Sequence, residues 1–345
     1  MNPHANMIYI SSLILGTLIT ITSNHWILAW IGSEINMLAI IPLIAKQHHP
    51  RAIEASIKYF LTQAAASSLL LFAIINNTWN SGQFNITQLT NTTSSTMVTT
   101  ALAMKLGLAP FHYWLPETLQ GTTTMMTLIL TTWQKLAPLA LLVMINQSLS
   151  TPLLMGLSLL SMLVGGWGGL NQTQLRKIMA FSSIAHVGWM IMILTMSTKL
   201  TLLTFYTYII MTATMLLMIK LLETNKMSTT MTSWTKLPIL NVMMMLNLMS
   251  LAGLPPLTGF MPKLLILQEL QKPHMITATM AAILSLLSLF FYLRIAYYST
   301  ITLPPSTTNY HQQWRHKINQ KPYLPLMIMT SSLLTPIMPT LMMTM

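Results

Sequence analysis

Long apolar stretches, separated by short polar connections, run along almost the whole chain. A helix that crosses a bilayer needs about 20 mostly apolar residues, and eleven stretches meet this requirement. The predicted spans are 5–22, 25–45, 58–76, 95–112, 122–145, 151–169, 178–196, 200–222, 237–270, 274–298 and 323–344. The longest polar gaps, 77–94 and 299–322, leave no room for a soluble domain. The pattern therefore predicts an all-α, polytopic membrane protein, with one transmembrane domain over residues 1–345.

Basic residues are distributed unevenly between the two sides that eleven spans define. Twelve lie at alternate connections on one side, and two lie on the other, Lys199 and Lys272. The twelve are Lys46, Arg51, Lys58, Arg176, Lys177, Lys220, Lys226, Lys236, Arg294, Arg315, Lys317 and Lys321. Because connections on the inner side of a membrane carry an excess of Lys and Arg, we expect the N-terminus on that side and the C-terminus opposite.

The composition excludes several classes of protein and of site. Hydrophobic residues make up 53% of the chain and charged residues 6%, whereas soluble proteins carry about 25% charged residues. Cysteine is absent, which rules out disulfides, cysteine-ligated iron–sulfur clusters and cysteine zinc sites. The net charge of +12 comes from dispersed residues and does not indicate nucleic-acid binding. We predict that this chain binds no cofactor and no metal.

Four ionisable residues fall inside predicted spans: Glu34, Lys105, Lys135 and Lys263. Each buried charge costs at least about 2.5–3.5 kcal/mol, and such groups usually face a bundle interior or water and mark an ion path. Lysine loses its proton more readily when buried, whereas arginine stays charged, so this set suits a proton relay. The alternative is that Glu34 pairs with one lysine as a structural staple, which leaves two lysines unexplained.

Two apolar segments carry the same interruption. Residues 107–117 read GLAPFHYWLPE, and residues 253–263 read GLPPLTGFMPK. The identical positions are Gly107 and Gly253, Leu108 and Leu254, Pro110 and Pro256, and Pro116 and Pro262; Pro255 adds a further proline to the second segment. Proline breaks a helix, and matching broken helices in two halves of a transporter point to its ion path. A pair of ordinary proline kinks is the alternative.

Two histidines also lie at membrane depth. His112 is inside the first interruption, and His186 is near the middle of the predicted span 178–196. Histidine at such a position can join a proton path, but a buried histidine bonded to the backbone explains each of them equally well. No pattern of facing histidines indicates a haem site.

Several longer motifs resemble the NADH dehydrogenase subunit 2 family, in its vertebrate mitochondrial form. The motifs are KYFLTQAAAS (58–67), AMKLGLAPFHYWLPE (103–117), WQKLAP (133–138), GGWGGLNQTQLRKIMAFSSIAHVGWM (165–190) and LAGLPPLTGFMPK (251–263). The likeness covers the chain to about residue 300 and is weaker over the last 45 residues.

The resemblance implies an antiporter-like core subunit in the membrane arm of respiratory complex I. Members of this family have two inverted repeats of five helices, each with one broken helix. The halves would lie at about 58–170, broken near 107–117, and at about 178–298, broken near 253–263; residues 299–322 would form a matrix-side loop and 323–345 the last helix. The chain would lie in the mitochondrial inner membrane, with its N-terminus on the matrix side and its C-terminus on the intermembrane side.

The resemblance also assigns roles to the buried charges. Glu34 would modulate Lys105 in the first half-channel, Lys135 would connect the halves, and Lys263 would be the terminal lysine. His112 and His186 stand in family motifs, as candidates for the proton path.

The resemblance further implies partners and cofactors. The partners would be neighbouring antiporter-like and small core subunits, accessory subunits and membrane lipids, with no nucleic acid. The complex, as an H⁺-translocating NADH:ubiquinone reductase, would use NADH, FMN, iron–sulfur clusters and ubiquinone outside this chain. The resemblance leaves open whether a phospholipid such as cardiolipin binds to this chain. The other candidate functions are a free-standing cation/proton antiporter and a structural membrane scaffold.

Overall fold

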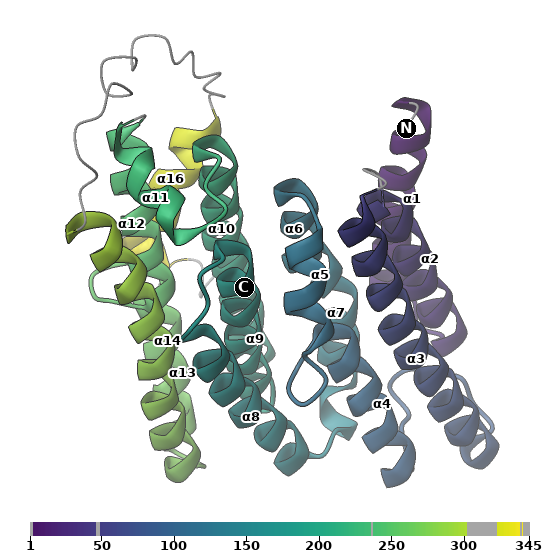
Figure 1. Ribbon diagram of the computed structural model, residues 1–345. Coiled ribbons are helices and arrows are strands. Elements are labelled where there is room, and N and C mark those ends of the chain that lie inside the picture. Colours follow the sequence, from purple (N-terminus) through teal and green to yellow (C-terminus); the bar gives the residue numbers. More distant parts are fainter. Residues whose placement is uncertain (1–2, 46–48, 236, 302–322, 339, 341–345) are drawn as a thin grey trace. The chain divides into compact units, whose positions relative to one another are not determined.

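The computed structural model describes residues 3–45, 49–235, 237–301, 323–338 and 340. Within these ranges the secondary structure is helical, without a β-strand, which confirms the predicted fold class. The chain divides into two compact units, unit 1 (Met1–Ser161) and unit 2 (Met162–Met345). Figure 1 shows the helices of each unit running side by side as a bundle.

Unit 1 holds seven α-helices and the first part of an eighth, within the described ranges. They are α1 (Pro3–Thr22), α2 (Trp26–Ile44), α3 (Pro50–Ser81), α4 (Thr92–Leu106), α5 (Trp114–Gly121), α6 (Thr124–Thr131), the 3₁₀ turn η2 (Trp133–Lys135), α7 (Leu136–Ile145), the 3₁₀ turn η3 (Asn146–Ser148) and α8 (Thr151–Gly169).

Unit 2 begins at Met162, inside α8. Its described elements are α9 (Leu175–Leu194), α10 (Thr198–Leu222), α11 (Met227–Thr232), the 3₁₀ turn η4 (Ser233–Thr235), α12 (Pro238–Ala252), α13 (Phe260–Gln271), α14 (Met275–Ile301), α16 (Tyr323–Leu333) and the 3₁₀ turn η6 (Thr335–Ile337).

The helices account for the predicted spans in two ways. In the described part of the chain, eight helical segments are long and apolar enough to cross a membrane, and the α6–α7 segment is one of them. The three remaining predicted spans contain the shorter helices α4, α12 and α16, of 15, 15 and 11 residues. Both α4 and α12 are the first halves of broken helices. The end of the last predicted span, at 341–344, lies outside the described residues.

Both predicted interruptions are present and share one geometry. Each first half-helix ends at a glycine with positive φ, Gly107 at +74° and Gly253 at +82°, a conformation that glycine adopts without steric cost. The Ala109–Pro110 and Pro255–Pro256 peptide bonds are both cis. Pro116 and Pro262 each occupy the third position of the following helix, where a backbone N–H has no intrahelical partner to lose.

A further interruption was not predicted. The predicted span 122–145 is broken at Lys135, where the turn η2 separates α6 from α7. Pro138, in the first turn of α7, offers no N–H to the carbonyl of Gln134, and its ring crowds that carbonyl. The WQKLAP motif therefore places Lys135 at a break in the helix.

The two halves of the chain match at a constant offset in residue number. Gly107 and Gly253 are 146 residues apart, and the same shift converts the bounds of α4, Thr92–Leu106, into those of α12, Pro238–Ala252. It also brings α1, α2 and α3 to within a few residues of α8, α9 and α10. Four helices thus recur in the same order at this offset, whereas the repeat halves predicted near 58–170 and 178–298 stay a prediction.

Basic residues gather at one end of unit 2. Arg176 and Lys177 lie in the first turn of α9, Lys220 lies in the last turn of α10, and Arg294 donates hydrogen bonds to two carbonyl groups of the α8–α9 connection. Lys199 lies at the opposite end of α10. These residues of unit 2 are grouped as predicted, and the side of the membrane that each end faces stays a prediction. Lys46, Lys236, Arg315, Lys317, Lys321 and most of the predicted loop 299–322 lie outside them.

Candidate functional site

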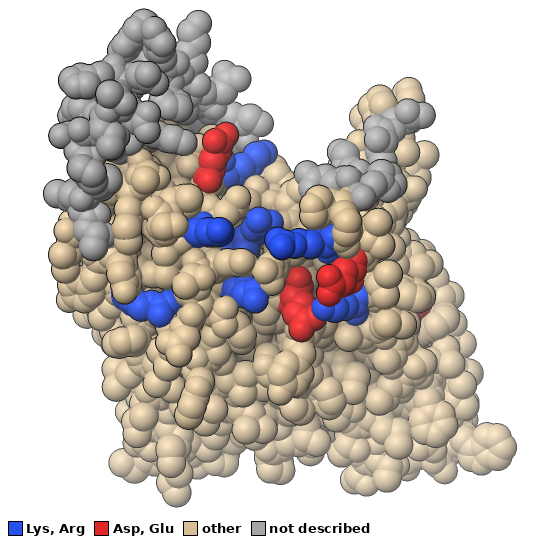
Figure 2. Space-filling view, in the orientation of Figure 1, with Lys and Arg blue, Asp and Glu red and all other residues tan. Residues whose placement is uncertain are grey.

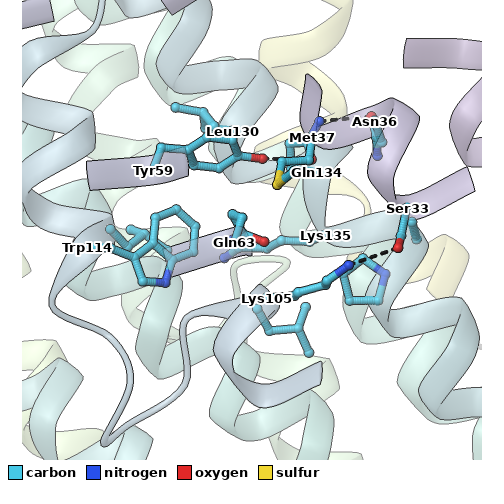
Figure 3. A pocket seen from close by; sticks show the side chains of 14 residues that line it. Ser33, Asn36, Met37, Tyr59, Gln63, Lys105, Trp114, Leu130, Gln134 and Lys135 are labelled. Carbon is cyan, nitrogen blue, oxygen red and sulfur yellow. Dashed lines mark hydrogen bonds between the residues drawn. The ribbon is translucent and has the colours of Figure 1, made fainter. Parts of the chain in front are cut away.

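A small polar cavity in unit 1 brings together side chains from seven helical segments. Its polar lining consists of Ser33 and Asn36 from α2, Tyr59 and Gln63 from α3, Lys105 from α4, and Gln134 and Lys135 from η2. The cavity has a volume of about 20 Å³, and a polar space above about 10–15 Å³ can hold a water molecule. Two of the predicted relay lysines therefore share one water-sized cavity (Figure 3).

Lys105 reaches this cavity from the end of the first half-helix. Its Nζ donates a hydrogen bond of 2.8 Å to Ser33 Oγ, and Ser33 in turn donates to the Trp30 carbonyl at 2.8 Å. Trp114 Nε1 donates to the Met104 carbonyl at 3.2 Å, and the same carbonyl accepts the backbone N–H of Gly107 at 3.2 Å. The break thus holds the lysine amine against α2.

Lys135 is the most deeply buried of the three predicted relay lysines, with 2% of its surface exposed. It belongs to η2, so the backbone that carries it is held by the bond from Lys135 N to the Thr132 carbonyl, 3.3 Å long. The neighbouring Gln134 side chain donates to Asn36 Oδ1 at 2.9 Å and accepts from the Tyr59 hydroxyl at 3.3 Å.

Glu34 does not pair directly with a lysine. It follows Ser33 on α2, and its Oε1 atom is buried without a hydrogen-bond partner. Two ion pairs shorter than 4 Å are present at Lys58, with Glu54 and Glu117. The observed geometry is therefore not that of a Glu34–lysine staple.

Unit 2 has a comparable cavity around Lys263. Lys263 Nζ donates to the carbonyl of Ala252, the last residue of α12, at 2.8 Å; a cation is favoured at a helix C-terminus. His186 from α9 and Thr204 and Thr207 from α10 line the same cavity, which also has a volume of about 20 Å³. The structure therefore brings Lys263 and His186 together.

His112 is not brought to either lysine cavity. It is 7% exposed, its Nδ1 atom has no hydrogen-bond partner, and its ring lies 4.2 Å from that of Tyr113. The prolines of both interruptions shape the backbone beside the cavities, and Pro262 also lines the cavity around Lys263. No cluster of three or more potential metal ligands occurs among the residues that the structure describes.

Several residues of the site escaped the sequence analysis. Ser33 and Asn36 are three residues apart on α2, and Tyr59 and Gln63 are four apart on α3, so each pair shares one helix face. That spacing of polar residues inside apolar spans was a usable signal.

An exposed ion cluster was also missed: Lys58 lies 2.5 Å from Glu54 and 2.6 Å from Glu117. Most of the surface drawn in Figure 2 carries no charged side chain.

The chain resembles known proteins in sequence and in structure. Residues 23–288 match the family described as NADH:quinone oxidoreductase/Mrp antiporter, TM, and residues 289–342 match NADH dehydrogenase subunit 2 C-terminus. The chain is 59% identical to NADH-ubiquinone oxidoreductase chain 2 of Struthio camelus, over 98% of both sequences.

Solved structures share the fold at lower sequence identity. A chain of respiratory complex I from Thermus thermophilus superimposes with a TM-score of 0.85 at 23% identity, over 99% of this chain and 78% of that one. A chain of the Mrp complex from Dietzia sp. gives a TM-score of 0.74 at 20% identity, over 85% and 59%. These structures show the fold, and the sequence matches show that this chain belongs to the NADH dehydrogenase subunit 2 group of the NADH:quinone oxidoreductase/Mrp antiporter family.

Proposed function

We propose that this chain is a proton-translocating, antiporter-like core subunit in the membrane arm of respiratory complex I. The observation that carries the proposal is the pair of buried lysines, Lys105 and Lys135, around one water-sized polar cavity beside a broken helix. The Lys263 cavity beside the matching break in unit 2 supports it. Such ionisable groups are costly inside a membrane, and transport of ions is the usual reason for them.

In this proposal the proton moves by exchange between amines. A proton leaves the Lys105 ammonium group, passes through a water molecule in the cavity and binds the neutral amine of Lys135, so that charge is conserved. Glu34, next to Ser33 on α2, modulates Lys105. Lys263 accepts the proton in the second half, and His186, in the same cavity, assists its onward movement.

Electron transfer would take place elsewhere in the assembly. The relatives' name, NADH-ubiquinone oxidoreductase chain 2, supports a complex in which other subunits use NADH, FMN, iron–sulfur clusters and ubiquinone. This chain would contribute translocation without a redox centre of its own, and it would contact other membrane-arm subunits, accessory subunits and phospholipids such as cardiolipin.

The proposed location is the mitochondrial inner membrane, with the N-terminus in the matrix. Single cysteines test this orientation cleanly because the chain has none of its own. Thr173→Cys, in the basic α8–α9 connection, should react with an impermeant maleimide only from the matrix side. Gln83→Cys, in the α3–α4 connection, should react only from the intermembrane side. The reverse result would contradict the orientation.

The decisive experiment measures protons pumped per electron in the assembled complex in liposomes. Lys135→Ala should lower this ratio, or the coupled turnover, while leaving assembly intact. Lys199→Ala removes an exposed lysine outside the cavities and should change neither. A normal ratio in Lys135→Ala would remove that lysine from the relay and favour a scaffold. Cation/proton exchange by the purified chain alone would favour a free-standing antiporter.

A further inference from the structure

The turn that carries Lys135 interrupts the regular hydrogen bonding of the helix. The turn η2 separates α6 from α7, and Pro138 deprives the Gln134 carbonyl of its regular helical partner. A helix broken in this way can change its register or twist at the break. Since Lys135 is at the break, either change would turn its amine away from the cavity.

The Gln134 side chain supplies cross-links at this point. Its amide NH₂ group donates to Asn36 Oδ1 on α2 at 2.9 Å, and its Oε1 atom accepts from the Tyr59 hydroxyl on α3 at 3.3 Å. Asn36 and Tyr59 are each 2% exposed, so bulk water does not compete for these bonds. Figure 3 shows Gln134 bonded on both sides, to Tyr59 and to Asn36.

The cross-link to α2 also means that one helix holds both lysine-bearing segments in place. Ser33, which accepts the Lys105 amine at 2.8 Å, precedes Asn36 by three residues on the same helix. Positions three apart lie on one face of a helix. One face of α2 therefore holds the Lys105 amine through Ser33 and the Lys135 turn through Asn36.

We propose that Gln134 is a positioning residue, which holds η2 in register with α2 so that Lys135 faces the cavity it shares with Lys105. This inference rests on the proposed proton relay and names a residue on which that relay depends. Proton transfer requires hydrogen-bond distances, directly or through one water. A displacement of about 1 Å can slow a reaction by about 100-fold, so loss of the Gln134 bonds should stop transfer through this chain at normal turnover.

The test uses the complex reconstituted in liposomes, with protons pumped per electron as the readout. Gln134→Leu removes both bonds and should reduce the ratio to the value found for Lys135→Ala. Tyr59→Phe removes only the longer bond and should give a smaller loss. Asn77→Leu is the matched control: it removes a fully buried amide that bonds the α3–α4 connection, and it should lower the yield of assembled complex without changing the ratio.

A swap of the two amides separates positioning from general stability. Gln134→Asn shortens the side chain and should lower the ratio, whereas Asn36→Gln with Gln134→Asn restores the combined length and should recover much of it. This pair keeps the test decisive if Gln134→Leu does not assemble. The proposal is overturned if assembled Gln134→Leu pumps normally, or if the swap recovers nothing. A normal ratio in Lys135→Ala would instead overturn the relay itself.

Discussion

The close contact between α1 and α2 offers a test of how packing controls the lysine cavity. Gly16 and Gly32 face each other: a Cβ atom added at Gly16 would lie 2.9 Å from the Gly32 carbonyl oxygen and 3.1 Å from Asn36 N. Both obstacles are backbone atoms, so a side-chain rotation cannot relieve them. Carbon atoms prefer about 3.5 Å or more, and Gly16→Ala should therefore push α2 away by about 0.5 Å.

That displacement is large enough to disturb the site. A shift of that size along the 2.8 Å bond from Lys105 to Ser33 would carry it beyond about 3.2 Å, the usual limit of such a bond. Overpacking of this kind costs about 1–3 kcal/mol. The matched control is Gly156→Ala on α8, where an added Cβ meets nothing within 4 Å. Both variants gain the same helix propensity, about 0.5–1 kcal/mol, so the difference between them isolates the packing cost.

Two measurements on the assembled complex test whether the Gly16–Gly32 contact sets the position of α2. Gly16→Ala should lower the temperature at which half the NADH-driven activity is lost, relative to Gly156→Ala, and should also lower the number of protons pumped per electron. Gly156→Ala should match the native protein or exceed it in thermal midpoint. Equal midpoints and equal ratios in the two variants would refute the idea that the Gly16–Gly32 contact sets the position of α2.

Two further predictions concern unit 2. Gly253→Ala should destabilise the complex by about 1–2 kcal/mol, because alanine at positive φ is strained. It should also lower the number of protons pumped per electron, because the new Cβ would lie 3.0 Å from Lys263 Nζ. The control Gly82→Ala also has positive φ but nothing within 4 Å, so a lowered number of protons per electron in that variant would contradict the argument. Arg294→Met removes bonds to two carbonyls of the α8–α9 connection, each worth about 1.5–3 kcal/mol, and limited proteolysis should cleave that connection faster than in Lys177→Met. Equal cleavage in the two variants would show that Arg294 does not anchor the connection.

Much of the fold followed from the sequence because membrane spans obey local rules. The apolar stretches predicted the helices, and the Gly/Pro pattern predicted both interruptions, since glycine with positive φ and proline in a first turn are properties of single positions. The break at Lys135 was missed, although Pro138 signals it. The interruption there is a single 3₁₀ turn, too short to disturb the hydropathy of the span.

The candidate site was less predictable. The sequence marked Glu34, Lys105, Lys135 and Lys263 as charges in apolar surroundings. It did not show that Lys105 bonds to Ser33 rather than pairing with Glu34. Adjacent residues on a helix point in directions about 100° apart, so the choice between these neighbours depends on how α2 is rotated against α4.

By itself, the sequence determined that this protein is an all-helical membrane chain with two matching broken helices and a few costly buried charges. Those features follow from hydropathy and from the backbone chemistry of glycine and proline. Only the tertiary structure decided which polar groups share a cavity: Gln134 with Asn36, Lys105 with Lys135, and Lys263 with His186. The physical reason is that hydrogen bonds between helices depend on packing to within a few tenths of an ångström, and that packing joins residues far apart in the chain.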